Sequence, residues 1–356
     1  MTPKIIHSDF KLNGITFSFD DLKEVGYCLV KEGKNFEIAI GNFLMDWVDD
    51  SETITVSTSG STGVPKKISL KKQQMVNSAL ATGKFFDLNP TNTALLCLPA
   101  DYIAGKMMLV RAMVLGLRLD YVLPDSTPLK CIKTAYDFGA MIPLQLENSL
   151  SKINFFKKLI IGGAPLSNTL IAKVQKKKTV MYETYGMTET ITHIAAKKIN
   201  HNTNKNLYFE ALPNVTLSTD DRDCLVIDAP EISDEVVITN DVVNLISAQE
   251  FEWSGRFDSI INSGGVKLNP ETIEAKLSAL LEVPFFVAGV PDAILGHKLI
   301  LLVEGAADVA TIQTKIARLK SLAKFEIPKE TYSLEKFIRT ENGKIQRTKT
   351  LVLLRK

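Results

Sequence analysis

The chain has 356 residues with a formal net charge of +2, and 45% of its residues are apolar and 23% charged. This length suffices for two domains or more with large cores, and the composition is that of a soluble globular protein. The small net charge excludes a broad nucleic-acid-binding surface.

The N-terminus and the cysteines predict a cytoplasmic protein. Residues 1–14 contain no apolar signal core, and no stretch is long enough to span a membrane. The four cysteines are scattered and form no Cys-x-x-Cys pair, which predicts buried free thiols in a reducing compartment. We expect neither nucleic acid nor a membrane as a partner, and a homodimer stays an open alternative.

Short apolar runs alternate with helical segments in the first part of the chain. Strands are expected at residues 53–56, 94–98, 117–122, 159–161 and 180–182. Helices are expected between them at residues 71–86, 106–115 and 167–176. This alternation predicts a large α/β domain with a mostly parallel sheet that is covered on both faces.

The pattern changes near residues 253–258. Asn269 followed by Pro270 is typical of a helix start, with Asn as the cap and Pro at the first helical position. Expected in the tail are a helix ending near Leu281, strands at 285–290 and 298–303, a helix at 310–323 and a hairpin at Asn342-Gly343. We therefore expect an N-terminal domain of residues 1–257 and a mobile α+β domain of residues 258–356, joined by a hinge.

A Ser/Thr/Gly-rich segment, Ser-Thr-Ser-Gly-Ser-Thr-Gly-Val-Pro-Lys, follows the first expected strand at residues 57–66. Its glycines let the backbone N–H groups approach phosphate, its hydroxyls add donors, and its lysine adds positive charge. The candidate phosphate-binding residues are Thr58, Ser59, Gly60, Ser61, Thr62, Gly63 and Lys66. The segment does not fit the Walker A pattern, and the alternative is a polar surface loop.

A second segment, Tyr-Glu-Thr-Tyr-Gly-Met-Thr-Glu, occupies residues 182–189. Glu189 follows a strand-to-helix turn, where a carboxylate is well placed to hold Mg²⁺ beside phosphate oxygens. Tyr185 offers a flat face to a purine. The alternative for Glu189 is an ordinary acid in the first turn of a helix.

These two segments, in this order, resemble the phosphate loop and the aromatic–Gly–x–Thr–Glu motif of the adenylate-forming superfamily. This superfamily includes acyl-CoA synthetases, luciferases and peptide-synthetase adenylation domains. The resemblance extends from Ser57 to the end of the chain and implies ATP, Mg²⁺ and coenzyme A as ligands. It also implies that Thr188 and Glu189 act in catalysis, while Tyr185 and Gly186 hold the nucleotide.

Two further segments resemble the family's nucleoside-binding motifs. Residues 162–166, Gly-Gly-Ala-Pro-Leu, resemble the loop that lines the adenine, with Gly163 and Ala164 in the cofactor site. The alternative is a simple strand-to-helix turn. Thr239-Asn240-Asp241 stands where the family has Thr-Gly-Asp, and Asp241 would accept hydrogen bonds from the ribose hydroxyls.

Residues 255–265 resemble the family's hinge motif. The resemblance implies that Arg256 reaches ribose or phosphate and that Asp258 is the pivot between the domains. It also implies that Gly264 and Gly265 let the loop pass close to the pantetheine arm of CoA. The alternative for Arg256 and Asp258 is a surface ion pair of little energetic value.

Residues 342–347, Asn-Gly-Lys-Ile-Gln-Arg, match the family's catalytic lysine motif. Lys344 would stabilise charge on the carboxylate and the α-phosphate while the adenylate forms. The C-terminal domain would then rotate about Asp258 and admit the CoA thiol. The alternative for Lys344 is an exposed turn in a basic tail.

The acid substrate is predicted from residues 98–111. Residues 98–105 resemble the segment before the family's acid pocket, and Arg111 lies six residues after Gly105. The o-succinylbenzoate–CoA ligases of menaquinone biosynthesis place an arginine at this offset, where it meets a second substrate carboxylate in a bidentate manner. The alternative is an arginine that snorkels from an amphipathic helix. Tyr102 stands where the family often has His, so part of the pocket differs.

We therefore expect an ATP-dependent ligase that converts o-succinylbenzoate to its CoA thioester through an acyl-adenylate, with release of AMP and pyrophosphate. The segment before the phosphate loop is short for the family, and the spacing between Glu189 and Asp241 is compressed. Three alternatives stay open: another aryl- or fatty-acid–CoA ligase, an enzyme that loads a carrier protein, and a non-catalytic nucleotide-binding scaffold.

Overall fold

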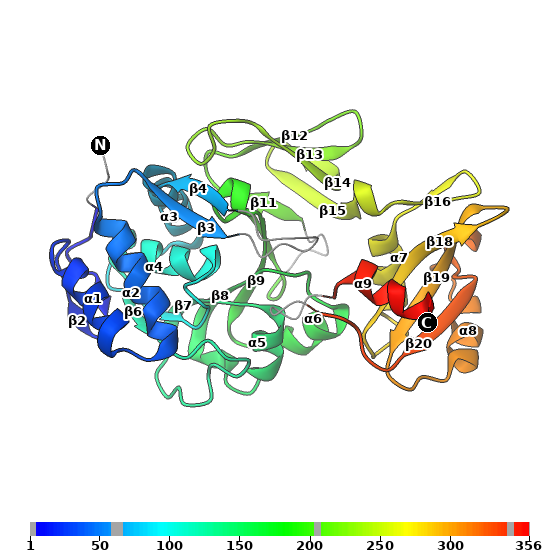
Figure 1. The fold of residues 1–356 in the computed structure, drawn as a ribbon, viewed down its shortest axis with the longest axis horizontal. Coiled ribbons are helices and arrows are strands. Elements are labelled where there is room, and N and C mark those ends of the chain that lie inside the picture. The colour runs from blue at the N-terminus through cyan, green and yellow to red at the C-terminus, as the bar shows by residue number, and fades with distance from the viewer. Residues whose placement is uncertain (1–4, 58–66, 203–207, 340–344, 356) are drawn as a thin grey trace.

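The computed structural model describes residues 5–57, 67–202, 208–339 and 345–355, which form a large and a small lobe (Figure 1). The large lobe contains a 13-stranded sheet in the order β12-β13-β14-β15-β11-β10-β9-β8-β7-β5-β6-β1-β2. Its strands are β1 (Lys11–Leu12), β2 (Ile15–Thr16), β5 (Thr93–Leu96), β6 (Arg118–Tyr121), β7 (Tyr136–Met141), β8 (Phe156–Ile161), β9 (Val180–Gly186), β10 (His193–Lys198), β11 (Phe209–Ala211), β12 (Thr216–Thr219), β13 (Cys224–Asp228), β14 (Val237–Ser247) and β15 (Glu250–Arg256).

The α/β class is confirmed, and the sheet is mixed. From β1 through β6, β5, β7 and β8 to β9 the neighbouring strands run parallel. Beyond β9 all pairs are antiparallel, because the chain returns there without crossover helices. The expected strand at residues 53–56 forms β3 (Thr53–Ser57), which pairs with β4 (Lys67–Lys71) in a separate antiparallel hairpin rather than in the parallel sheet.

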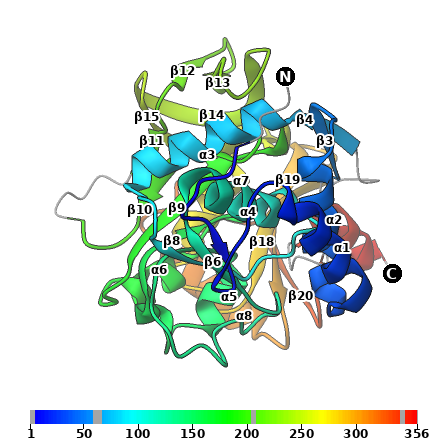
Figure 2. The same ribbon diagram turned by 90° about the vertical axis from the view of Figure 1, so that its left-hand side faces the viewer.

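Helices cover both faces of the parallel part, as predicted. They are α1 (Asp21–Glu32), α2 (Asn35–Val48), α3 (Lys72–Phe86), α4 (Ile103–Leu115), α5 (Pro143–Asn148) and α6 (Asn168–Val174). Within β5, Ala94 and Leu96 join the core that includes α3 and α4, whereas Leu95 joins the core under α5 and α6. This alternation follows from the period of two in a strand. Figure 2 shows α3 and α4 lying together across the sheet.

No helix or strand was expected before residue 53, yet α1 and α2 form a tightly packed helix pair there. A Cβ atom on Gly26 would lie 2.7 Å from the Gly41 carbonyl oxygen, and one on Gly41 would lie 2.5 Å from that of Gly26. The two glycines therefore allow the helix backbones to touch.

The small lobe has a second sheet in the order β17-β16-β19-β18, with β20 paired to β19. Its strands are β16 (Ile261–Ser263), β17 (Val266–Leu268), β18 (Phe285–Asp292), β19 (Gly296–Glu304) and β20 (Glu330–Leu334), and its helices are α7 (Pro270–Leu277), α8 (Val309–Ala317) and α9 (Arg347–Val352). The predicted cap of α7 is confirmed, since the Asn269 side chain accepts from the backbone N–H groups of Glu271 and Thr272. The domain boundary at residue 258 stays a prediction.

All four cysteines are free, but Cys28 and Cys131 are exposed, so the prediction of buried thiols holds for Cys97 and Cys224 alone. Among the described residues, no helix has both the length and the apolar content that crossing a membrane requires.

Candidate functional site: nucleotide motifs and a buried arginine

The adenine-loop and Glu189 segments meet at one edge of the sheet. Strands β8 and β9 are parallel, with Ile161 opposite Glu183, so the residues that follow them lie side by side. A Cβ atom on Gly162 would lie 2.5 Å from the Thr184 hydroxyl oxygen, which shows that the turn after β8 packs directly on β9. Gly163 is exposed and Ala164 is half-buried. The carboxyl edge of a parallel sheet is the usual place for a ligand in α/β proteins.

Gly186 ends β9 at a point where a side chain does not fit. It pairs with His193 of β10, and a Cβ atom on it would lie 2.2 Å from the Thr192 carbonyl oxygen and 2.5 Å from the His193 Cα atom. Between the two strands, the 3₁₀ helix η2 (Thr188–Thr190) carries the end of the motif. Glycine in this motif is therefore required by the close approach of β10.

Glu189 is exposed in η2, and Thr188 beside it is half-buried. In the part of the chain that the structure describes, no cation pairs with Glu189. An exposed carboxylate is compatible with a Mg²⁺ ligand. Since η2 has three residues, compensation of a helix dipole offers Glu189 little alternative role.

Residues 5–57, 67–202, 208–339 and 345–355 contain no group of three or more His, Cys, Asp or Glu side chains that would hold a metal ion by themselves. An ion at Glu189 would therefore take further ligands from phosphate oxygens and water, as Mg²⁺ commonly does.

Asp241 lies buried beside Tyr185, although 56 residues separate them along the chain. The Tyr185 hydroxyl donates to one carboxylate oxygen at 2.7 Å, and Trp253 Nε1 donates to the other at 3.1 Å. Burial, and then the Asp241 charge, raise the pKa of Tyr185, so its hydroxyl keeps the donated proton. Sequence reasoning missed Trp253, which lies outside the family motifs that it used. The carboxylate is thus held in place, as a ribose-binding role requires.

Arg256 is the cross-strand partner of Asp241, where β15 ends. Its guanidinium donates two hydrogen bonds of 2.8 Å to the Asp258 carboxylate, which raise the pKa of Arg256 and lower that of Asp258. The side chains are 47% and 53% exposed, so the pair adds little to stability. Their roles as ribose ligand and pivot stay predictions.

The end of β15 packs against the cap of α7 beside this ion pair. Gly255 has φ +138°, and a Cβ atom on it would lie 2.5 Å from the side-chain oxygen of Asn269, the cap of α7. Gly264 and Gly265 have φ values of +59° and +80° and form the tight turn between Ser263 and Val266. Two positive φ angles in a two-residue hairpin turn account for both glycines. A role in passing CoA stays a prediction.

Arg111 is enclosed within α4. Residues 105 to 115 are all buried, and Arg111 itself is 1% exposed. The guanidinium does not reach solvent, so the snorkelling alternative is wrong. Its contacts are uncharged: Thr82 Oγ1 at 3.4 Å, Thr192 Oγ1 at 3.3 Å and His193 Nδ1 at 3.4 Å.

Within the described residues, no carboxylate pairs with Arg111, and burial alone lowers its pKa, to about 9. The guanidinium is therefore still protonated at neutral pH. A buried charge is normally paired, and Arg111 has hydrogen-bond partners but no counter-ion among the described residues. Thr192 and His193 lie just after the Glu189 motif, so this cation is adjacent to the nucleotide motifs.

Tyr102 is the N-cap residue of α4 and is half-buried. A Cβ atom on Gly105 would lie 2.2 Å from the Pro99 carbonyl oxygen, so the turn that precedes α4 requires glycine there. Contact of either residue with substrate stays a prediction.

The seven candidate phosphate-binding residues within 58–66, together with Lys344, lie outside the described residues. Among their described neighbours, Ser57 at the end of β3 pairs with Lys67 at the start of β4, and Arg339 forms an antiparallel bridge with Ile345.

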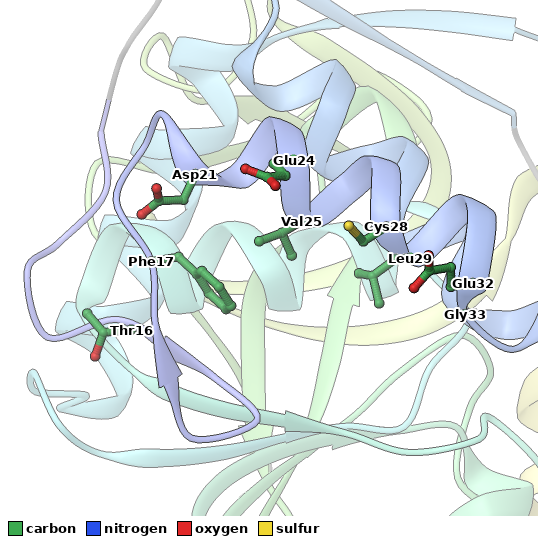
Figure 3. Close-up of a pocket in the computed structure, with 9 residues that line it drawn as sticks. All are labelled: Thr16, Phe17, Asp21, Glu24, Val25, Cys28, Leu29, Glu32 and Gly33. Atoms are coloured by element: carbon green, nitrogen blue, oxygen red, sulfur yellow. The ribbon is translucent and has the colours of Figure 1, made fainter.

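A cavity of about 670 Å³ lies beside α1, lined by residues between Thr16 and Gly33 such as Phe17, Val25 and Leu29 (Figure 3). None of the candidate site residues lines it. Residues 162–166, the Glu189 segment and Asp241 meet elsewhere, at the carboxyl edge of β8 and β9.

The two lobes and their motifs have the architecture of adenylate-forming enzymes. Residues 49–231 match the model of the family described as AMP-binding enzyme, and the chain belongs to this family. The match to the AMP-binding family and the similarity to acid–CoA ligases together show that the chain is an AMP-forming acid–CoA ligase.

Among curated relatives, the 2-succinylbenzoate–CoA ligase of Enterococcus faecalis is 23% identical over 81% of this chain and 67% of its own. That of Salmonella typhimurium is 24% identical over 82% of this chain and 66% of its own. The chain thus spans about two thirds of the length of these relatives.

Two solved structures are also similar. An acyl-CoA synthetase (AMP-forming)/AMP-acid ligase II-like protein from Dyadobacter fermentans is 34% identical, with 93% of this chain and 98% of that chain covered and a TM-score of 0.62. The o-succinylbenzoate CoA synthetase of Bacillus subtilis, with an acyl-adenylate intermediate, has a TM-score of 0.71 at 17% identity, with 92% and 80% covered. At that identity, the second likeness shows the fold alone.

Proposed function

We propose that this protein converts o-succinylbenzoate to o-succinylbenzoyl-CoA through an acyl-adenylate, as a ligase of menaquinone biosynthesis. The observation that carries the substrate assignment is Arg111, a buried guanidinium with no carboxylate partner in the described part of the chain. The names of the curated relatives support the same acid.

The second carboxylate of the substrate would form an ion pair with the Arg111 guanidinium. A bidentate carboxylate would meet the planar guanidinium and replace its long contacts to neutral groups with shorter hydrogen bonds to an anion. Thr192 is half-buried, whereas Thr82 and His193 are buried, so the carboxylate would approach from the side of Thr192. An acid that lacks the second carboxylate leaves the guanidinium unpaired and is rejected for that reason.

Nucleotide binding follows from the motifs that meet at the sheet edge. The ribose hydroxyls would donate to Asp241, which Tyr185 and Trp253 hold in place. Glu189 would hold Mg²⁺, which would neutralise charge on the phosphates. Residues 58–66 would donate backbone and side-chain hydrogen bonds to those phosphates.

The reaction then depends on how the enzyme positions the acid and ATP, since no protein side chain needs to form a covalent bond to either. One carboxylate oxygen of the acid bonds to the α-phosphorus of ATP, the bond to pyrophosphate breaks, and pyrophosphate leaves with its electron pair. Lys344 would stabilise the charge on this group. After a rotation about Asp258, the CoA sulfur would bond to the acyl carbon and displace AMP, along a path beside Gly264 and Gly265.

The test is an assay with ATP, Mg²⁺ and CoA on five acids. They are o-succinylbenzoate, its two analogues that each lack one carboxylate (3-benzoylpropionate and 2-butyrylbenzoate), benzoate and octanoate. We expect efficient AMP and thioester formation with o-succinylbenzoate alone, and no thioester without CoA.

Preference for benzoate or octanoate would overturn the substrate assignment. Thioester formation on a carrier protein but not on CoA would identify a carrier-loading enzyme. No pyrophosphate release with any acid would identify a scaffold.

A further inference from the structure

His193, the first residue of β10, contacts Arg111 and is 5% exposed. Its Nδ1 atom lies 3.4 Å from Arg111 Nη2, and its Nε2 atom lies 3.4 Å from the Thr82 hydroxyl oxygen. The ring also packs edge-on against Phe86, at 6.0 Å between centroids. Neither the family motifs nor the proposed mechanism uses this histidine.

The hydrogen bonds around Thr82 define which imidazole nitrogen carries the proton. The Thr82 hydroxyl donates its only proton to the Ser78 carbonyl oxygen at 2.9 Å, one turn back in α3. Its oxygen therefore acts as an acceptor toward both Arg111 Nε and His193 Nε2. It follows that Nε2 carries the proton and that Nδ1 presents a lone pair to Arg111.

The imidazole is held in its neutral form. Burial, and then the neighbouring Arg111 charge, lower the pKa of His193 well below its ordinary value. Within the described residues, Arg111 is the charged group that contacts the ring, and no carboxylate does.

The contacts that His193, Thr82 and Thr192 make to Arg111 are all 3.3 or 3.4 Å long, and all three partner groups are neutral. Such contacts lie at the long end of hydrogen-bond geometry and are weak. They orient the fork of the guanidinium without neutralising it. A carboxylate side chain at residue 82, 192 or 193 would instead form an ion pair with Arg111 in the free protein.

We propose that His193 is a positioning and specificity-determining residue that holds Arg111 with an uncharged acceptor and so reserves its charge for the second carboxylate of the substrate. This inference rests on the proposed function of Arg111 as the receptor of that carboxylate. Selectivity for a diacid then depends on a neutral group at residue 193, not on Arg111 alone.

Two substitutions separate this role from simple packing. His193→Asn keeps an uncharged acceptor near the position of Nδ1, whereas His193→Asp, of nearly the same size, supplies an internal counter-ion. The measurement is kcat and KM for o-succinylbenzoate and for one monoacid, together with Tm for each variant. The monoacid is 3-benzoylpropionate or 2-butyrylbenzoate, whichever has the higher kcat/KM with the wild type.

We expect H193N to keep the preference for the diacid within about threefold of wild type. H193D should raise KM for the diacid by roughly 30-fold or more while kcat stays within about threefold, because a buried ion pair must break before substrate binds. KM for the monoacid should stay the same or fall. A purely structural role would instead change both acids alike and affect H193N and H193D equally.

If H193D does not fold, His193→Leu takes its place, since it removes the acceptor without adding charge. We expect KM for the diacid to rise about tenfold and KM for the monoacid to stay unchanged. Equal changes for both acids would overturn the inference.

Arg111→Met separates the two proposals. If the wild type shows no preference for the diacid, or if R111M keeps it, the proposed function of Arg111 fails. If wild type and R111M behave as proposed but H193D keeps full diacid preference, the inference on His193 alone fails.

Discussion

Replacing Arg111 by methionine should stabilise the free protein and remove its use of o-succinylbenzoate. Methionine suits α4, which already contains Met107, Met108 and Met113 among its buried residues. The substitution removes a guanidinium that is 1% exposed and has no carboxylate partner among the described residues. Stability should rise while activity falls, because the Arg111 charge has an anionic partner only when the substrate is bound.

The magnitudes follow from the burial of this charge. Replacing buried charged groups with apolar side chains often stabilises proteins by about 1–4 kcal/mol. For a lobe of this size, that predicts a rise in Tm of roughly 2–16 °C. Truncating one partner of a buried charge pair costs about 2–5 kcal/mol of binding, which is roughly 30- to 5,000-fold in kcat/KM for the diacid.

The assay is differential scanning calorimetry of both proteins without ligand, combined with kcat/KM for o-succinylbenzoate and for the better monoacid analogue. The monoacid controls for damage to the nucleotide site, and its kcat/KM should stay within about threefold of wild type. A lower Tm for R111M, with unchanged use of the diacid, would refute the reasoning.

Three further results are expected. Because the pKa of His193 is lowered in the folded protein, the unfolded chain takes up a proton below about pH 6.5 that the folded chain does not. The free energy of unfolding should thus fall as pH drops from 7 to 5, by up to about 1.4 kcal/mol per pH unit, and equal slopes for wild type and H193N in urea titrations would contradict this. Gly186→Ala should destabilise the protein by more than about 2 kcal/mol, since its Cβ atom would lie 2.2 Å from a backbone oxygen. The matched control Gly296→Ala, with φ +73° and open space around it, should cost about 1–2 kcal/mol, and equal losses would contradict the packing argument. Trp253→Phe removes a hydrogen bond to the Asp241 carboxylate and should raise KM for ATP roughly 3- to 30-fold, whereas an unchanged KM would show that Trp253 does not support the ribose site.

Local patterns were enough to predict the strands β5, β6, β8 and β9 and the helices α3, α4 and α6, but not the parallel strand β7 or the helix α5. The apolar run of β8 and the cap of α7 depend on neighbouring residues alone, and Asn269 caps its helix as expected. The motifs also carried enough information to predict that Tyr185 and Asp241 belong to one site, which their 2.7 Å hydrogen bond now supports.

Long-range contacts account for what sequence reasoning missed. The partners of Arg111 come from α3 and from the start of β10, and no local pattern marks Thr82 or His193 as its neighbours. Likewise, the antiparallel half of the sheet depends on pairings such as β11 with β15, which are set by tertiary structure. Gly26 and Gly41 lower the helix propensity of α1 and α2, and the close packing of the two backbones that offsets this is a tertiary contact.

The most direct test of the second-carboxylate assignment is a crystal structure of this protein with a non-hydrolysable o-succinylbenzoyl-adenylate analogue. We predict that the free carboxylate of the ligand lies against Arg111, with two N–H···O contacts of about 2.7–2.9 Å. A free carboxylate exposed to solvent, or paired with another cation while Arg111 keeps only Thr82, Thr192 and His193, would contradict the account.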